Sequence, residues 1–536
     1  MTVSPSSTTG STTVLLRNGV VHTHSPLAGT AIAIRDGLVV FVGDEDQAEA
    51  YAQAEEVVDL RGALVAPAFV DAHVHTVQSG FQLTQLDLRG TRSLAEALDA
   101  VASYAVANGP DTVLIGAGWD ESTWPEGRPP TADELERAAP GRRISLDRRD
   151  GHSSVISSDL AAAVPGLLSM DGYSASGRIE RDARHAVSNA LASLVGPDQR
   201  LEAARRAVAE MATNGVAAFH ENAAPHIGPE YEVDLVRQAA AETGLLATLY
   251  WGELGAIDKV AALGVQGLAG DLNADGAIGS RTAALRTAYD DMAGHCGHAY
   301  LEADQIAEHV ILCTEAGLQA GFHCIGDAAI DAITEGFRTA EKRLGAPAIR
   351  QGRHRLEHVE MPSPDAVAMM ADLDVTASMQ PLFDHLWGGP DRMYAERLGG
   401  RWRGMNPVAG MGHAGVRIAF GSDAPVTDVR PWEAVRAAVH HRDPEQRIGA
   451  ALAFDHHTSG GWRAARNDVA GTLTPGAPAH LAVWDCPGGL EGREGRKGPS
   501  GMILPILDPA VPLPQIHRLV VAGRTVADHT IDGEGP

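Results

Sequence analysis

The feature that most limits the possible folds is a series of eight short apolar runs, separated by stretches with helical spacing. Segments between the runs, such as 304–317 and 327–345, carry apolar residues three and four positions apart, which is typical of helices with one buried face. Strands that alternate with helices form parallel sheets, so we predict an α/β fold with a (β/α)8 TIM-like barrel. The runs lie at residues 64–75, 215–223, 245–253, 270–276, 318–327, 354–360, 374–381 and 416–425.

Both ends of the chain carry a different, purely β-type pattern. Residues 13–23 and 30–44 are short β-runs interrupted by Asn-Gly and Asp-Gly turns, and similar runs return at 480–485 and 516–528. We therefore expect one composite β-sandwich domain, built from residues 1–67 and 470–536, with the barrel at 68–469.

The interval between the first two barrel runs is too long for a barrel loop. It contains apolar runs of its own at 112–127 and 142–154. We predict an inserted subdomain at about 78–192, lying over the mouth of the barrel.

Candidate metal ligands stand at the ends of several runs, and barrel active sites lie at the carboxyl ends of the strands. His73 and His75 are two residues apart, so on a strand both side chains point to one face. His323, His358 and Asp423 end three further runs. Imidazoles and a carboxylate at one end of a barrel predict a metal site, because zinc takes these ligands.

The segment His354–Glu360 also matches H-x-x-E-H, the zinc signature of inverted-motif metallopeptidases. Two histidines four apart share a metal only on a helix, where they lie about one turn apart. Gly352 before the segment and two prolines after it predict a strand instead, on which the histidines lie about 13 Å apart. The peptidase interpretation therefore fails. We expect His354 to be structural, Glu357 to point away from the barrel interior, and His358 alone to face the mouth.

The motifs taken together resemble the metal-dependent amidohydrolase superfamily, in particular the branch with the YtcJ-like proteins and N-substituted formamide deformylase. The resemblance covers nearly the whole chain and includes PAFVDAHVH, GWDESTWPEGRPPTADEL, DGHSS, ADGAIGSRTAAL, HCIGDAAID, HRLEHVE, SMQP, FGSDAPV and GTLTPGAPAHLAVWD. It implies that His73, His75 and His323 bind a divalent metal, with zinc as the expected ion. It also implies that Asp423 is a ligand and the proton shuttle. His358 is implied as either a ligand of a second metal or a hydrogen-bond donor to the substrate oxygen.

Two positions depart from the family pattern. Relatives carry a lysine in the fourth strand where this chain has Asp271, and the carbamylated form of that lysine commonly bridges two metals. Its absence favours one Zn²⁺ ion and leaves a second open, with Asp271 as a further candidate ligand despite its shorter reach. His480 replaces an aspartate in the terminal β-domain, where we expect only local consequences.

Candidate substrate-binding residues come from the insert and from two strand ends. Aromatic walls with a few polar groups are typical of small-molecule pockets, although tryptophans serve equally well in a core. The candidates are Trp119, Asp120, Trp124, His152, Glu221 and Gln380.

The predicted reaction is hydrolysis of a C–N bond, in an amide or N-substituted formamide, by a metal-activated water. Asp423 takes the proton from that water, and His358 helps to hold the developing oxyanion. A hydrolytic deaminase of a heterocyclic or amidine-like substrate needs the same metal site and stays open as an alternative. A non-catalytic binding or regulatory protein requires the loss of ligands that this sequence retains.

Charge and cysteine content limit the partners and the location. The net charge of −26, from 69 acidic and 43 basic residues, argues against nucleic acid or anionic membranes as partners. The four cysteines form no C-x-x-C pair, and the first residues lack the basic start and apolar core of a signal peptide. We expect a cytoplasmic protein with a small-molecule substrate, and the resemblance leaves a homodimer open.

Overall fold

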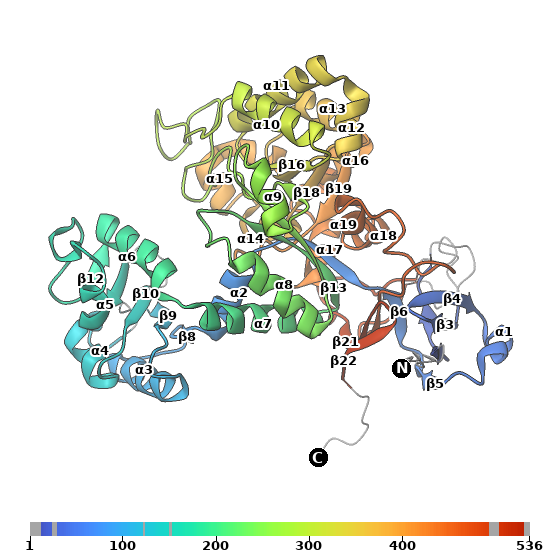
Figure 1. Ribbon diagram of the computed structural model, residues 1–536, viewed down its shortest axis with the longest axis horizontal. Helices are drawn as coiled ribbons and strands as arrows, with labels where there is room; N and C mark the ends of the chain where they lie inside the picture. The colour runs from blue at the N-terminus through green and yellow to red at the C-terminus, as the bar shows by residue number, and fades with distance from the viewer. Residues whose placement is uncertain are drawn as a thin grey trace, which may run out of the picture. The chain divides into compact units, whose positions relative to one another are not determined.

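The computed structural model describes residues 12–23, 29–119, 121, 124–148, 153–491 and 503–529. The chain divides into two compact units (Figure 1). One unit consists of Thr76–Ala207, and the other of Met1–His75 with Val208–Pro536. The second unit contains the barrel runs and the β-strands from both ends of the chain.

An eight-stranded sheet forms the centre of the larger unit, in the order β19-β18-β17-β16-β15-β14-β13-β7. Every adjacent pair in this order is parallel. A parallel bridge between Val74, the last residue of β7, and Ala424, just beyond the end of β19, joins the two outer strands. The predicted (β/α)8 barrel is confirmed. Its strands are β7 (Phe69–Val74), β13 (Val216–Ala223), β14 (Leu246–Trp251), β15 (Gly267–Leu268), β16 (Gln319–Cys324), β17 (Arg355–His358), β18 (Thr376–Met379) and β19 (Arg417–Phe420).

Helices follow the barrel strands and cover them (Figure 1). In α11 the buried residues Ile330, Ile333, Phe337 and Ala340 recur at helical spacing and form one apolar face. The other helices of this part are α8 (Glu232–Thr243), α9 (Ile257–Leu263), α10 (Ala303–Glu315), α12 (Ala346–Gly352), α13 (Pro364–Asp372), α14 (Pro381–Trp387), α15 (Met393–Leu398), α16 (Val408–His413), α17 (Pro431–Val439), α18 (Ala450–His456) and α19 (Ser459–Ala464), and α11 itself spans Asp327–Leu344.

The fourth barrel strand lies earlier than the sequence predicted. The run at 270–276 is not a strand, because β15 covers only Gly267–Leu268 and the chain turns at Gly270, whose φ is 81°. Glycine adopts this left-handed conformation without steric cost. The loop that follows still runs alongside β16, through a parallel bridge between Asn273 and His323. Asp271 therefore stands at the start of a loop beyond the strand.

Strands from both ends of the chain share one sheet beside the barrel. Its order is β2-β6-β20-β21-β22, so the strands before residue 68 pair with strands after residue 480. A second sheet has the order β4-β3-β1-β5, and a cluster that includes Leu16, Ile32, Leu481 and Val520 joins the two. The strands are β1 (Thr13–Arg17), β2 (Val20–Val21), β3 (Ala31–Arg35), β4 (Leu38–Gly43), β5 (Glu56–Asp59), β6 (Leu64–Pro67), β20 (Leu481–Asp485), β21 (Gln515–Val521) and β22 (Arg524–Asp528).

The smaller unit has its own five-stranded sheet, in the order β12-β11-β10-β9-β8, and its own core. Trp119 at the end of β9 is fully buried and donates its indole N–H to the carbonyl of Leu146. The strands are β8 (Leu86–Asp87), β9 (Leu114–Trp119), β10 (Ile144–Arg148), β11 (Ser153–Ile156) and β12 (Arg178–Glu180), and the helices include α2 (Thr76–Thr84), α3 (Leu94–Ala107), α4 (Ala132–Ala138), α5 (Ser158–Ala162) and α6 (Arg181–Leu194), with α7 (Pro197–Thr213) leading back to the larger unit.

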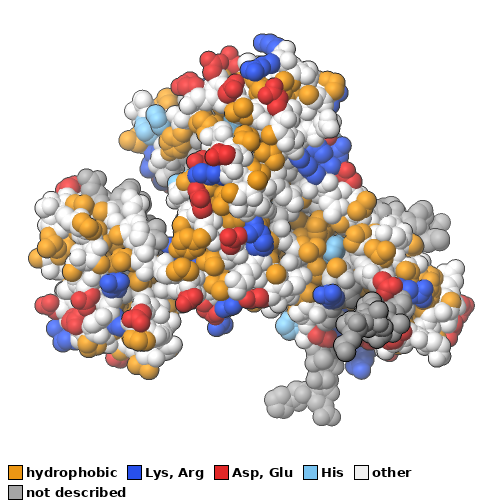
Figure 2. All heavy atoms as spheres, in the orientation of Figure 1, with side chains coloured by type: hydrophobic (Ala, Val, Ile, Leu, Met, Phe, Trp, Pro, Cys, Tyr) orange, Lys and Arg blue, Asp and Glu red, His pale blue; other side chains and the backbone are white. Residues whose placement is uncertain are grey.

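The surface carries charges of both signs. On the face shown in Figure 2, acidic and basic side chains lie interspersed rather than in one large patch of either sign. Among the described residues, no helix is both long enough and apolar enough to cross a membrane.

Candidate metal centre

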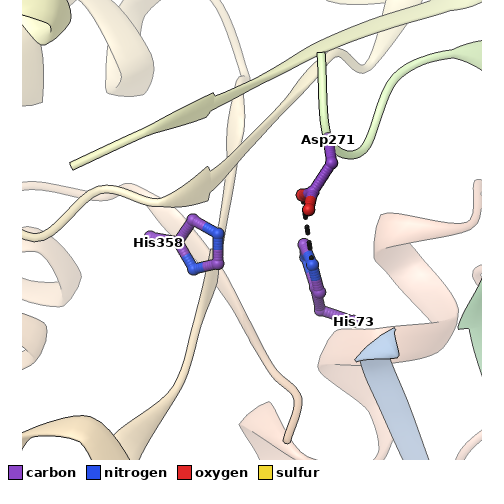
Figure 3. A group of neighbouring side chains, drawn as sticks. All are labelled: His73, Asp271 and His358. Atoms are coloured by element: carbon purple, nitrogen blue, oxygen red, sulfur yellow. Dashed lines mark ion pairs between the residues drawn. The ribbon is translucent and has the colours of Figure 1, made fainter. Parts of the chain in front are cut away.

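Four side chains converge at the carboxyl end of the barrel. Nε2 of His73 lies 3.3 Å from Oδ1 of Asp271 and 3.4 Å from Oδ1 of Asp423. Nε2 of His75 lies 3.2 Å from Oδ2 of Asp271 and 3.2 Å from Oδ1 of Asp423. Figure 3 shows the carboxylate of Asp271 pointing at the ring of His73, with the ring of His358 lying opposite these two side chains. We call His73, His75, Asp271 and Asp423 the ligand cluster.

The spacing of the ligand cluster fits a metal ion. Around a tetrahedral zinc ion with bonds of about 2.0–2.1 Å, neighbouring ligand atoms lie about 3.3 Å apart. Nε2 of His73 and Oδ1 of Asp271 are buried, and neither makes a hydrogen bond to any described residue. Buried polar atoms are normally satisfied, so atoms like these mark a place for a missing partner. The donor set of imidazoles and carboxylates is the one that zinc takes.

Without a metal, the cluster compensates its charge through protons. Burial lowers the pKa of His73, but the carboxylates of Asp423 and Asp271 outweigh it and raise that pKa to about 10. The pKa of His75 is raised for the same reason. Burial raises the pKa of Asp271 and of Asp423, but the two histidines reverse this and hold both pKa values below the usual range. A divalent cation can replace these protons, since it supplies the same positive charge.

Glu357 holds His73 in place, which corrects the expectation that it points away from the barrel. Its Oε2 accepts a hydrogen bond from Nδ1 of His73 at 2.8 Å, and both side chains are fully buried. Arg355 donates to Oε1 of Glu357 at 2.5 Å and to the carbonyl of Ala72 at 2.6 Å. Burial would raise the pKa of Glu357, but the charge of Arg355 holds it well below its usual range. A carboxylate on Nδ1 leaves Nε2 of His73 for the metal.

His358 enters the same site from the end of β17 because the backbone turns there. Its φ is 71° and that of Val359 is 49°, both in the left-handed region, so the strand alternation stops at Glu357. Nδ1 of His358 bonds Oε1 of Gln380 at 2.7 Å. An amide oxygen only accepts, so Nδ1 donates. Burial lowers the pKa of His358, so its neutral ring presents a lone pair on Nε2.

His323 lies beside this arrangement. Its ring packs edge-on against His358 with the centroids 4.5 Å apart, and its Nδ1 lies 3.7 Å from Oδ1 of Asp275. Burial lowers the pKa of His323 to about 3, so the ring is neutral and able to bind a metal. Among the described residues there are two groups in which all ligand atoms lie within 4.8 Å of one another, and His323 belongs to neither group. One group is His73, His75 and Asp423, and the other is His73, Asp271 and His358.

A cavity of about 390 Å³ opens next to the ligand cluster. His75, Asp271, His323, His358 and Asp423 form its polar end. The rest is largely apolar and includes Ile278, Ile325, Phe383, Trp387, Met393 and Val426. Small-molecule sites have this composition, in which a few polar groups converge in an apolar pocket.

One further carboxyl group faces this cavity. Glu360 is almost fully buried, and the hydroxyl of Tyr394 donates to its Oε2 at 2.7 Å. Burial raises the pKa of Glu360 to about 8, and the charges of Asp275 and Asp423 add to this. Glu360 is not among the candidates predicted from the sequence.

Comparison with known proteins identifies the family behind this geometry. The amidohydrolase family profile matches residues 56–527 of the chain. The chain belongs to the amidohydrolase family. This confirms the resemblance drawn from the motifs.

Several relatives of this amidohydrolase match over most of their length. It is 27% identical over 522 residues to the protein LONG AFTER FAR-RED 3 of Arabidopsis thaliana, with 88% of each chain covered. It is 26% identical to YtcJ of Bacillus subtilis (strain 168), covering 78% of this chain and 82% of the relative. It is 24% identical to the N-substituted formamide deformylase of Arthrobacter pascens, covering 85% of this chain and 90% of the relative.

Solved structures share the fold. An uncharacterized metal-dependent hydrolase from Pyrococcus furiosus has a TM-score of 0.73 at 24% identity, covering 87% of this chain and 97% of the other. An adenosine deaminase from Xanthomonas campestris with bound zinc has a TM-score of 0.54 at 15% identity, covering 97% of this chain and 94% of the other. These likenesses show the shared fold, and the assignment as a hydrolase rests on the family profile.

The candidate substrate residues lie in various places in this amidohydrolase. Trp119 and Trp124 are buried in the core of the smaller unit, where Trp124 donates its indole N–H to the carbonyl of Thr91. Their rings pack in this core and their indole N–H groups bond to backbone carbonyls, which corrects the prediction that they contact the substrate. Glu221 is buried in β13 and does not line the cavity, and Gln380 acts on His358. Asp120 and His152 lie outside the described residues.

His354 is structural, as expected. Its Nδ1 accepts from the backbone N–H of Ala320 at 2.9 Å, and its Nε2 lies 3.0 Å from Oγ1 of Thr314. Both ring nitrogens are therefore engaged away from the ligand cluster, and β17 is a strand. The two histidines of the peptidase motif therefore do not converge on one site.

Two residues that support His73 were not predicted from the sequence, namely Glu357, which contacts its ring, and Arg355, which contacts Glu357. They are two apart on one strand, which puts them on the same face, and the sequence signal for this was present. His358 reaches the site as predicted, and the prediction for Glu357 is wrong because the left-handed turn at His358 ends the alternation of the strand. A buried arginine and glutamate in alternation, both inside a barrel, are a stronger indicator of the inner face than the last residue of a strand.

Proposed function

We propose that this amidohydrolase hydrolyses the C–N bond of a small amide or N-substituted formamide and uses one zinc ion. The observation that carries the proposal is the ligand cluster, in which four pairs of a histidine nitrogen and an aspartate oxygen lie 3.2–3.4 Å apart at the edge of an apolar cavity. The similarity to the formamide deformylase over 85% of the chain supports the choice of bond.

His73, His75, Asp271, Asp423 and His358 are the residues that would supply the ligands of the metal, in the two groups His73, His75 and Asp423, and His73, Asp271 and His358. When bound, zinc makes water available as a nucleophile near neutral pH and polarises a carbonyl group. Asp423 keeps an ionised carboxylate because its pKa is lowered, so it can accept a proton from the nucleophile and deliver it to the leaving nitrogen. Its φ of 55° and the hydrogen bond from its backbone N–H to the carbonyl of His73, at 2.7 Å, fix it beside the cluster.

The neighbouring residues act by positioning. Glu357 fixes the ring of His73, and Gln380 fixes that of His358. Because Nε2 of His358 carries a lone pair in this tautomer, we favour a ligand role for His358 over a hydrogen-bond donor role. It lies with His73 and Asp271 in one of the two ligand groups.

A hydrolytic deaminase is the second candidate. The one-metal cluster suits it equally well, and the zinc-containing adenosine deaminase shares the fold at a TM-score of 0.54. The two reactions differ in their products, because amide hydrolysis releases an amine and a carboxylate whereas deamination releases ammonia.

The test combines metal analysis with a substrate screen. The purified protein is loaded with zinc, its metal content is measured by mass spectrometry, and N-formyl amines, N-acyl amines and amino-heterocycles are assayed for amine and for ammonia. We expect about one zinc ion per chain and release of free amine. Ammonia from a heterocycle, with no turnover of any formyl or acyl amine by the loaded protein, would overturn the proposal in favour of the deaminase.

A further inference from the structure

The charge of the cavity beside the ligand cluster limits which substrates can enter it. Three carboxyl groups line it, those of Asp271, Asp423 and Glu360, and the described lining residues include neither lysine nor arginine. Substrates with a carboxylate or a sulfonate are normally held by arginine or lysine, because these residues supply positively charged hydrogen-bond donors. The described walls of this cavity offer none.

Two of the three carboxyl groups are already compensated. Asp271 and Asp423 each pair with His73 and His75, and a divalent cation in the ligand cluster would balance both. Glu360 has no such partner, since its contact is the neutral hydroxyl of Tyr394 on Oε2. The described residues form no hydrogen bond to its Oε1. This oxygen is therefore available to a bound molecule.

Aromatic side chains line the same cavity as Glu360, and one of them, Tyr394, contacts it. The ring centroids of Phe383 and Trp387 lie 4.8 Å apart, those of Trp387 and Tyr394 lie 6.1 Å apart, and Phe383 stacks on His358 at 5.9 Å. An anion in such surroundings loses its hydration and gains no counter-charge. It is disfavoured in either form of Glu360, because an ionised carboxylate repels it and a neutral acid gives it no positive charge.

We propose that Glu360 is a specificity-determining residue that restricts this amidohydrolase to neutral or cationic substrates. A substrate N–H or ammonium group donates to Oε1 of Glu360, the aromatic side chains hold its apolar part, and compounds with a carboxylate or sulfonate on that part, such as N-acyl amino acids, are excluded. This substrate class rests on the proposed C–N hydrolysis at the ligand cluster.

The test uses three formamides of 2-phenylethylamine that differ only at the para position of the ring, where they carry methyl, aminomethyl or sulfonate. Sulfonate is chosen because it is a weak metal ligand. The zinc-loaded protein is assayed for kcat/KM and, separately, for Kd by calorimetry. Placing like charges together in a desolvated site costs several kcal/mol, so we expect the sulfonate to be about 100-fold poorer than the methyl compound in both measurements.

Glu360→Gln isolates the residue, because the amide keeps an acceptor for Tyr394 and loses the charge. We expect the ratio of kcat/KM for the aminomethyl compound to that for the methyl compound to fall about tenfold, because the ammonium group favours the ionised form of Glu360 and the amide removes this charge-assisted hydrogen bond. Asp374→Asn is the matched control. It neutralises a carboxylate that pairs with Arg417 at the amino end of β18, and it should change none of the three values.

The outcomes separate this proposal from the proposed reaction. A sulfonate compound bound and hydrolysed about as well as the methyl compound overturns the charge rule, and so does failure of all three to bind. If the methyl and aminomethyl compounds bind well and the sulfonate does not, yet none is hydrolysed, the charge rule stands and the proposed reaction fails. The comparison within the wild type decides the charge rule even if Glu360→Gln does not fold.

Discussion

Replacing Asp271 by asparagine is the sharpest test of the ligand cluster. Asp271 touches both histidines of the first strand, at 3.3 Å from His73 and 3.2 Å from His75. The amide keeps the size of the carboxylate but loses its charge and much of its affinity for zinc. Four-ligand zinc sites in small domains are worth about 10–16 kcal/mol, so one ligand in four contributes about 3–4 kcal/mol. We therefore expect the Kd for zinc to rise about 100- to 1000-fold in the Asp271→Asn variant.

The assay is competition for zinc between the protein and a chromophoric chelator at fixed pH, with zinc per chain measured by mass spectrometry. Asp374→Asn serves again as the control, because Asp374 forms its ion pair with Arg417 far from the cluster in the barrel, before β18 begins. It should bind zinc like the wild type.

Two results would refute the reasoning. An unchanged Kd in Asp271→Asn would show that the carboxylate at this position is not a ligand, in spite of its distances. Two tightly bound zinc ions in the wild type would show that an aspartate in the place of the family lysine does not limit the site to one metal.

Three further predictions follow from buried groups. Glu357→Gln leaves Arg355 buried without a counter-charge, so it should lower the free energy of unfolding by about 3–5 kcal/mol and weaken zinc binding about 10- to 100-fold. Urea unfolding measures the first effect and zinc titration the second. A zinc affinity equal to that of the wild type would contradict the positioning role of Glu357. In the metal-free protein, stability should fall as pH rises from about 6.5, the pKa of an unfolded histidine, toward the folded pKa of His73 of about 10. Over that range the ring of His73 loses the proton that the carboxylates stabilise. A melting temperature that rises with pH would refute this prediction. Added zinc should remove the pH effect. Trp119→Ala should cost about 3–5 kcal/mol, because the ring fills the core of the smaller unit; a stable variant with an altered KM would instead favour a substrate contact.

Much of the site was predictable because it depends on local periodicity. His73 lies in β7 and His75 directly follows it, and the two-residue spacing brings both side chains into the ligand cluster. Eight apolar runs separated by helices with one apolar face leave few topologies other than a barrel. The same reasoning excluded the peptidase motif, since β17 is a strand and His354 faces away from the cluster.

The predictions of side-chain direction failed where a strand ends, or where the hydrophobic pattern does not show which face of the strand points into the barrel. Every residue of β17 is buried, because a barrel strand has side chains inside and helices outside, so the hydrophobic pattern does not tell which face is inner. At His358 the backbone enters the left-handed region, and alternation then no longer applies. Trp119 looked equally suited to a pocket and to a core, and only its neighbours in space decided for the core.

The sequence by itself determined the fold and its family, together with the ligands that end strands, since these follow from spacing along the chain. Only the tertiary structure decided that Asp271 reaches the two histidines, that Glu357 and Arg355 support them from below, and that Glu360 faces the cavity. Each of these depends on where a loop or strand end comes to lie against elements distant in the sequence. Such positions are set by packing across the barrel, which the local sequence does not encode.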